Sequence, residues 1–159
     1  MTTAPAQRFF SGIILLGALC RATPLHAQIE IGTWVRKSGE ATPGVISMTV
    51  TTCCNGGRRL VYHMTGSQAV LTIESAFDGS EAPVLVDGKP SGETMAIKRL
   101  DTHHAITIVK MSGKAFGTSK ATLSADGNTL TVVNDYTATA PGQRAGKSTE
   151  VWVRKAGAP

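Results

Sequence analysis

The sequence has few aromatic side chains, and its basic residues are not gathered in one place. Phe, Trp and Tyr together make up 5% of the 159 residues. Proteins that bind single-stranded nucleic acid combine a basic groove with aromatic rings on which the bases stack. Here the basic residues are scattered along the chain in pairs such as Arg36-Lys37 and Arg58-Arg59. We therefore expect no nucleic-acid partner.

Cysteine is also scarce, which excludes a small domain held together by several disulfides. The chain has three cysteines, Cys20, Cys53 and Cys54, and the last two are neighbours that cannot tie distant segments together. A chain of this length can bury a sufficient core without such cross-links. We expect one of the neighbours to point inward and the other outward at a strand end. The alternatives are a disulfide between the two, contact with a soft metal, and pairing with another molecule.

One long apolar run is present, Ile13–Leu19, and it is too short to cross a bilayer, which needs about 20 apolar residues. Arg8 precedes this run and small residues follow it, which is the pattern of a secretory signal. We predict a signal peptide over 1–27, cleaved after Ala27, and export to the periplasm or medium. Cleavage before Cys20 as a lipoprotein is the alternative. Loss of Arg8 and Arg21 lowers the formal charge from +5 to +3.

The sequence contains no recognisable catalytic constellation. It has no Gly-x-Ser-x-Gly nucleophile motif. His103 and His104 are neighbours in a predicted strand, so they point to opposite faces, and His63 lies on the polar face of another strand. A catalytic zinc site needs about three converging ligands. We therefore predict no enzymatic activity, no metal and no cofactor.

What the sequence does have is a series of short alternating segments separated by turn residues. Leu60, Tyr62 and Met64 share one face of their segment, and Asn55-Gly56-Gly57 and Asp126-Gly127 are typical hairpin turns. No segment has the periodicity of a helix. The predicted strands lie at 29–37, 45–53, 59–64, 71–74, 95–97, 104–108, 115–124, 130–136 and 149–154.

These segments predict one all-β domain over 28–159. Consecutive hairpins favour an antiparallel up-and-down β-barrel of about eight to ten strands, because closure removes the exposed sheet edges. A β-sandwich has the same strand pattern and stays the alternative. A barrel of about eight strands has an interior that holds packed side chains or one small ligand.

Several motifs resemble a group of small exported bacterial proteins of lipocalin-like, calycin type, most of which have no assigned function. The motifs are Gly32-Thr33-Trp34, an Asp87-Gly88-Lys89 turn, the segments 94–99 and 126–132, and the final Val151–Lys155. The resemblance covers most of 29–155 and implies a lipocalin-like barrel. It also implies that Trp34 closes one barrel end and packs against Arg154 of the last strand. The Arg-x-Tyr device of fatty-acid-binding relatives is replaced here by Glu150-Val151-Trp152.

Two functional hypotheses follow from this pattern. In the first, the barrel binds a small hydrophobic or amphipathic molecule through Tyr62, Met64, Arg99, Asn134 and Tyr136. In the second, the barrel is filled, and the loops 79–92 and 137–148 contact a protein partner of unknown identity or an envelope component. The side chains expected to point inward are Met48, Val50, Tyr62, Met64, Leu71, Ile73, Ile97, Ile106, Ile108, Leu130 and Val132.

Overall fold

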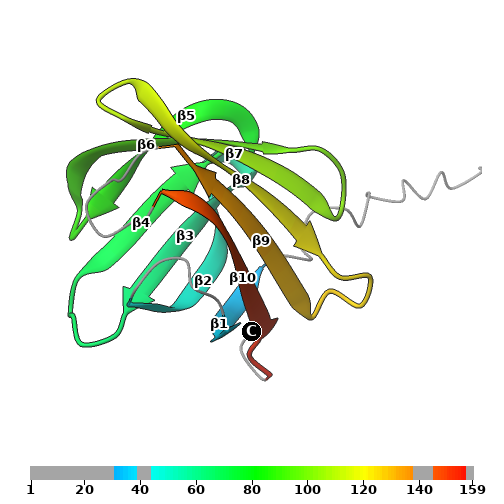
Figure 1. Ribbon diagram of the computed structural model, residues 1–159. Helices are drawn as coiled ribbons and strands as arrows, with labels where there is room; N and C mark the ends of the chain where they lie inside the picture. The colour runs from blue at the N-terminus through cyan, green and yellow to red at the C-terminus, as the bar shows by residue number, and fades with distance from the viewer. Residues whose placement is uncertain (1–30, 39–43, 138–144, 157–159) are drawn as a thin grey trace, which may run out of the picture.

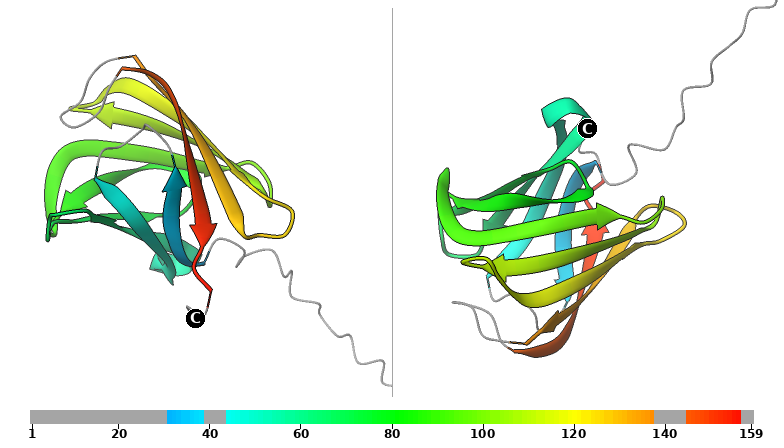
Figure 2. Two further views of the ribbon diagram at one scale, coloured as in Figure 1. Left: turned by 60° about the horizontal axis from the view of Figure 1, so that its bottom comes forward. Right: turned by 90° about the horizontal axis from the view of Figure 1, so that it is seen from above.

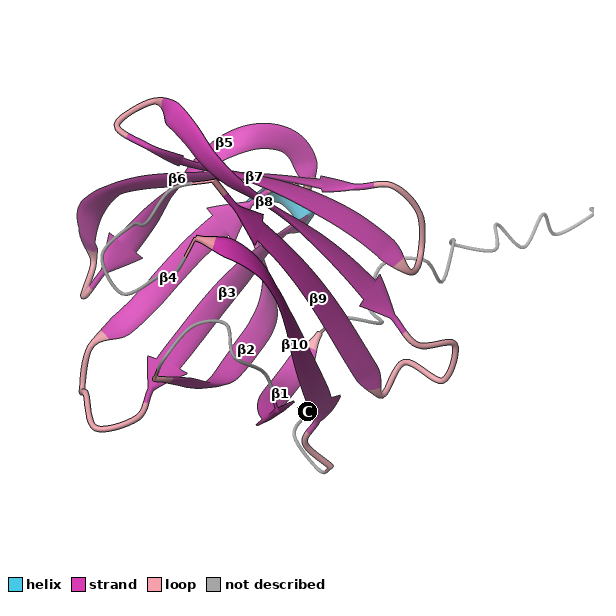
Figure 3. Cartoon of the chain, viewed as in Figure 1, coloured by secondary structure: helices cyan, strands magenta, loops and turns pink. Residues whose placement is uncertain are grey.

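The computed structural model describes residues 31–38, 44–137 and 145–156, and these form an all-β structure (Figures 1 and 3). A single 3-10 turn, Cys54–Gly56, interrupts the strands. The predicted signal peptide, 1–27, lies outside the described residues. The strands are β1 Gly32–Ser38, β2 Val45–Cys53, β3 Gly57–Met64, β4 Val70–Ser75, β5 Asp78–Val86, β6 Lys89–Arg99, β7 His104–Met111, β8 Lys114–Leu123, β9 Thr129–Tyr136 and β10 Gly146–Arg154.

The ten strands form one closed antiparallel barrel, so the fold is a barrel and not a sandwich. Each strand pairs with the next along the chain, and β1 pairs with both β2 and β10, which closes the sheet. Figure 1 shows β1 beside β10, and Figure 2 shows the sheet curving around its interior. Because the sheet closes on itself, each of the ten described strands has a neighbour on both sides, which protects its edges from pairing with another chain.

The tight turns follow from residues that tolerate a positive φ. Asp87 and Gly88, between β5 and β6, have φ values of 49° and 78°. Ser112 and Gly113, between β7 and β8, have values of 48° and 78°. Two consecutive positive φ angles match the right-handed twist of the paired strands in a two-residue hairpin. The expected contact loop 79–92 is therefore not a loop, because it consists of β5, this turn and the first part of β6.

The inward side chains differ in size from one part of the barrel to another. We call the inward residues of β2, β3 and β4 the bulky wall, and four inward residues in the middle of β7 and β8 the small wall. The bulky wall comprises Met48, Val50, Leu60, Tyr62, Leu71 and Ile73. The small wall comprises Ala105, Thr107, Ser119 and Ala121, in which Ala105 pairs with Ala121 and Thr107 with Ser119.

The prediction that Ile106 and Ile108 point inward is wrong. The side chains that line the interior from β7 are Ala105, Thr107 and Val109, and Ile108 is 40% exposed. Because successive residues of a strand face opposite sides, the isoleucines lie on the outer surface. His104 shares that outer face and is exposed.

A β-bulge in β2 places Ile46 on the outer face of the barrel. The pairing between β2 and β3 shifts between Val45 and Ser47, so Val45 is buried and Ile46 is 46% exposed. An extra residue in one strand moves the alternation by one position. The described residues contain no helix that is both long and apolar enough to cross a membrane.

Candidate functional site

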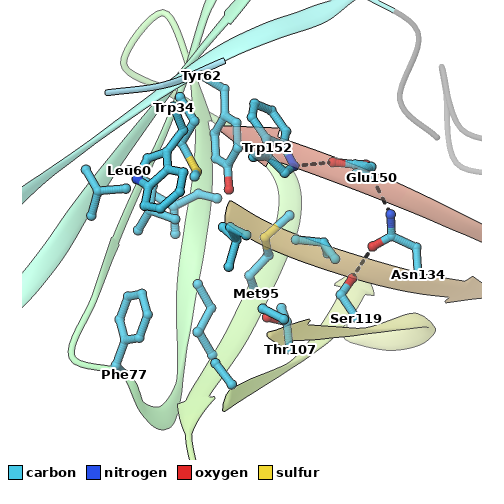
Figure 4. A pocket seen from close by; sticks show the side chains of 18 of the residues that line it. Trp34, Leu60, Tyr62, Phe77, Met95, Thr107, Ser119, Asn134, Glu150 and Trp152 are labelled. Atoms are coloured by element: carbon cyan, nitrogen blue, oxygen red, sulfur yellow. Dashed lines mark hydrogen bonds between the residues drawn. The ribbon is translucent and has the colours of Figure 1, made fainter. Parts of the chain in front are cut away.

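The barrel encloses a cavity of about 250 Å³, which is the principal candidate for a functional site. Figure 4 shows the side chains of its wall, with Trp34, Leu60 and Tyr62 on one side and Trp152, Glu150 and Asn134 on another. Most of the wall is apolar. The volume is a little below the roughly 300–1,000 Å³ of sites for drug-sized ligands, so the cavity suits a smaller molecule.

The small wall provides the free space. Its four side chains also point into the barrel, but they are shorter than those of the bulky wall. They are only partly buried, whereas Met48 and Ile73 of the bulky wall are 4% and 1% exposed. A cavity of this kind is an open volume that the protein's own side chains do not fill.

A chain of hydrogen bonds crosses three neighbouring strands at the cavity wall. Ser119 Oγ on β8 donates to Asn134 Oδ1 on β9 at 2.6 Å, and Asn134 Nδ2 donates to Glu150 Oε1 on β10 at 3.1 Å. Trp152 Nε1 donates to the other oxygen, Glu150 Oε2, at 2.9 Å. Asn134, Glu150 and Trp152 are all buried. The chain fixes the orientation of a buried carboxylate beside the cavity (Figure 4).

Tyr62 contributes a neutral hydroxyl group to the cavity. Its hydroxyl points into the cavity in Figure 4, and its ring lies edge-on to Trp152 with 6.3 Å between centroids. Burial raises the pKa of Tyr62 well above its ordinary value, and the negative charge of Glu150 raises it further. The phenol is therefore protonated at physiological pH and can both donate and accept a hydrogen bond.

A second aromatic pair lies where β8 and β9 meet. Tyr136 stacks on Phe116 with ring centroids 5.9 Å apart, and both are buried. Burial raises the pKa of Tyr136, a hydrogen bond with Ser119 lowers it, and the charges of Glu150 and Glu93 raise it. This pair borders the cavity through Tyr136.

Strand β6 places opposite charges on the cavity wall. Glu93 is half-buried, and burial raises the pKa of its carboxyl. Arg99 lies six residues further along on the same face, with its guanidinium carbon 5.3 Å from the ring centroid of Phe77. Six residues of strand span about 20 Å, so the two charges lie toward opposite ends of the barrel.

The predicted ligand-binding residues lie in two places. Tyr62, Arg99, Asn134 and Tyr136 line the cavity. Met64 instead packs against the edge of the apolar core.

Sequence reasoning missed several polar or aromatic groups of the wall, among them Glu93, Ser119, Glu150 and Trp152. The alternation of β10 puts Glu150 on the same face as Trp152, and this was the available signal. It is easily overlooked, because a charged residue in a strand is normally on the outer face.

Trp34 and Arg154 meet where the first and last strands pair. The Arg154 guanidinium carbon lies 4.4 Å from the Trp34 ring centroid, and Nε donates to Gly127 O at 3.0 Å. Gly32 has a φ of +136°, and a Cβ there would lie 2.8 Å from an Arg154 nitrogen. The cation–π contact between Arg154 and Trp34 therefore covers this end of the barrel. It needs glycine at position 32, because a side chain there would have a strained backbone and would approach Arg154 too closely.

The two neighbouring cysteines are joined to each other. Cys53 and Cys54 form a disulfide, so the expectation that one points inward and the other outward as separate thiols is wrong. The side-chain ligand atoms of Cys53, Cys54 and Glu74 lie within 4.8 Å of one another. Metals bind the thiolate, which the disulfide does not offer. Glu74 also accepts a hydrogen bond from Arg59 Nε at 2.7 Å.

No protein-family model and no curated protein matches the chain. The functional argument therefore depends on the cavity itself.

Proposed function

We propose that this protein is an exported, lipocalin-like carrier that binds a small hydrophobic or amphipathic molecule inside its barrel. The observation that carries the proposal is the cavity of about 250 Å³ next to an ordered polar chain. Ligand sites are typically concave and apolar, with a few polar groups that fix the ligand's orientation. Tyr62 and the Ser119–Asn134–Glu150 chain are groups of this kind, and a cavity without a ligand costs packing energy.

The export part of this proposal rests on the sequence of residues 1–27, and the carrier part on the cavity. The resemblance of the Gly32-Thr33-Trp34 and Val151–Lys155 motifs to lipocalin-like proteins supports both parts. The contact between Trp34 and Arg154 is the arrangement that this resemblance implies.

Native mass spectrometry tests the two parts in one preparation. The full chain is expressed in a bacterial host and purified from the periplasm without detergent. We expect a protein mass that corresponds to cleavage after Ala27, plus an added mass that disappears on extraction with organic solvent. Retention of the uncleaved chain in the cytoplasm would contradict export.

Titration with 1-octanol tests binding in the cavity directly. The chain has two tryptophans, Trp34 and Trp152, and both line the cavity, so their fluorescence reports on its occupant. We expect a saturable change in the wild type and its loss in Ala121→Leu, which fills the small wall.

Thr122→Leu is the matched control for this titration, because Thr122 is the exposed neighbour of Ala121 and faces outward. It should bind as the wild type does. A wild type that shows no saturable response to 1-octanol and carries no added mass would overturn the carrier function.

A further inference from the structure

The hydroxyl of Tyr62 differs from the polar chain beside it, because it has no partner. Ser119, Asn134 and Glu150 are hydrogen-bonded to one another, and the hydroxyl of Tyr136 is hydrogen-bonded to Ser119. Within the part of the chain that the structure describes, the Tyr62 hydroxyl makes no hydrogen bond, and none is drawn to it in Figure 4. Polar groups inside folded proteins are almost always hydrogen-bonded, because an unmade bond costs stability. The partner of this hydroxyl is therefore to be sought among the molecules that the cavity can bind.

The ring of Tyr62 is held in place by its neighbours. Tyr62 on β3 pairs with Met48 on β2 and with Leu71 on β4, and both of these side chains also line the interior. The ring of Trp152 lies edge-on to it. A polar group that is fixed before binding loses little entropy when a ligand arrives, so the hydroxyl is well placed to contribute to affinity.

The same hydroxyl faces the open part of the barrel. Around the closed sheet, β4–β7 separate β3 from β8 on one side, and β9, β10, β1 and β2 separate them on the other, so β3 and β8 lie opposite each other. Strand β8 carries Ser119 and Ala121 of the small wall. The Tyr62 hydroxyl, which points into the cavity in Figure 4, is thus directed at the space that the small wall leaves.

The phenol of Tyr62 is suited to donate a hydrogen bond. Burial and the charge of Glu150 raise its pKa, so the proton stays on the oxygen at physiological pH. A phenol is more acidic than an aliphatic alcohol and is the better donor. A ligand that displaces water from such a group loses affinity unless it replaces the hydrogen bond. The matching ligand group is therefore an acceptor.

The charged groups of the wall favour an uncharged ligand. Glu150 accepts hydrogen bonds from Asn134 and Trp152, and the guanidinium carbon of Arg99 lies 5.3 Å from the ring centroid of Phe77. A charged ligand would have to compete with these partners within the protein. Burying a charge without a partner costs far more than burying a neutral polar group, so a neutral acceptor suits the cavity better.

We propose that the Tyr62 hydroxyl donates a hydrogen bond to an uncharged acceptor oxygen, such as a ketone or ester carbonyl, of the molecule that the cavity binds. This inference rests on the proposed carrier function and specifies the ligand class of the same cavity. It makes Tyr62 the residue that distinguishes a carbonyl compound from a hydrocarbon of the same shape.

Two ligands of nearly the same shape test the inference. 2-Octanone has a carbonyl oxygen where 2-methyl-1-octene has a methylene group. The dissociation constants of both are measured by tryptophan fluorescence for the wild type and for Tyr62→Phe, which removes only the hydroxyl. We expect the variant to bind 2-octanone about fivefold more weakly, as for the loss of one hydrogen bond, and to bind 2-methyl-1-octene as tightly as the wild type or more tightly.

Two further measurements show whether the hydroxyl contacts the ligand. In the infrared spectrum of bound 2-octanone, the carbonyl stretch should lie at a lower frequency in the wild type than in Tyr62→Phe, because a hydrogen bond weakens the C=O bond. Thr122→Val is the matched control, because it removes a hydroxyl from an exposed position on the outer face. It should change neither affinity nor the carbonyl frequency.

The ligand-free protein gives an independent test of the missing partner. Tyr62→Phe should unfold at the same urea concentration as the wild type or at a higher one, because its hydroxyl has no bond to lose. Tyr136→Phe should unfold at a lower concentration, because it loses the hydrogen bond with Ser119. A loss in Tyr62→Phe as large as that in Tyr136→Phe would mean that the hydroxyl already has a partner, and it would overturn the inference.

The binding results separate this inference from the carrier function. If Tyr62→Phe changes the affinities of the two ligands equally, or leaves the carbonyl frequency unchanged, the inference is overturned and the carrier function is unaffected. A wild type that binds neither ligand overturns both.

Discussion

The bulky wall and the small wall belong to the same sheet but have different roles. On β2, β3 and β4 the inward side chains are large, and Ile73 and Val50 are 1% and 3% exposed. On β7 and β8 the equivalent positions hold alanine, serine and threonine, which are only partly buried. The comparison shows how a closed barrel can contain a cavity without a wider circumference. One wall provides the packing energy, and the other leaves the space.

Ile73→Ala should have the largest effect on stability. Ile73 is 1% exposed in the bulky wall, and truncation of such a side chain typically costs about 2–5 kcal/mol. Urea denaturation gives the free energy of unfolding of each variant. Ile108→Ala, on the outer face, should cost about 1 kcal/mol or less. Equal losses at the two positions would contradict the assignment of the bulky wall as the core.

Gly117→Ala should cause the next largest loss in the free energy of unfolding. Gly117 is inward on β8 beyond the small wall, and a Cβ there would lie 2.1 Å from Tyr136 Cδ1. Overpacking of this kind typically costs about 1–3 kcal/mol, and the near-ultraviolet circular dichroism of the Tyr136–Phe116 stack should change. Added to Tyr136→Ala, the same substitution should cost little, because the ring is gone. If the cost persists in that background, the clash is not its cause.

Ala121→Leu should change the free energy of unfolding by less than about 1 kcal/mol, because the added carbons enter open space. The measurement is again urea denaturation. A loss as large as that of Gly117→Ala would mean that the small wall is already filled, and it would remove the distinction between the walls.

Glu93→Gln should have the smallest effect on the free energy of unfolding, and this effect should depend on pH. Burial raises the pKa of Glu93 in the folded protein above its ordinary 4.5. The folded state therefore holds this proton more tightly than the unfolded state, so this group's contribution to stability falls as pH rises above about 4.5. The variant should match the wild type near pH 3 and be more stable near pH 7. Asp78, Asp101 and Asp126, whose pKa values are lowered, act in the opposite direction and are unchanged between the two proteins.

The sequence predicted the architecture well, because alternation and turn residues act locally. The hairpin turn at Asp87-Gly88 and the inward faces of β3 and β9 followed directly from the pattern. Closure of the barrel by β1 and β10 depends on a pairing between the two ends of the domain, which no local pattern encodes. The sequence therefore left barrel and sandwich as alternatives.

The interior was predicted less well, because hydrophobicity was used as the sign of an inward face. On β7 this rule fails, since the cavity requires small inward residues and leaves Ile106 and Ile108 outside. On β2 it fails at Ile46 because of the bulge. The same rule hid Glu150, whose burial depends on hydrogen bonds from a neighbouring strand. Such a role becomes visible only when the strands are paired.

The pairing of β1 with β10 also determines when the barrel can be completed during folding. Arg154 donates a hydrogen bond to Ile31 O, and 123 positions of sequence separate the two residues. The other strand pairs join neighbours along the chain, so they can form as local hairpins. Closing a long loop has a higher entropic cost than closing a hairpin, and non-local pairing slows folding. Until the C-terminal strand arrives, the meander β1–β9 is an open sheet with unpaired edges at β1 and β9, and its future cavity is an exposed apolar face. The last strand thus completes both the barrel and its cavity in one step.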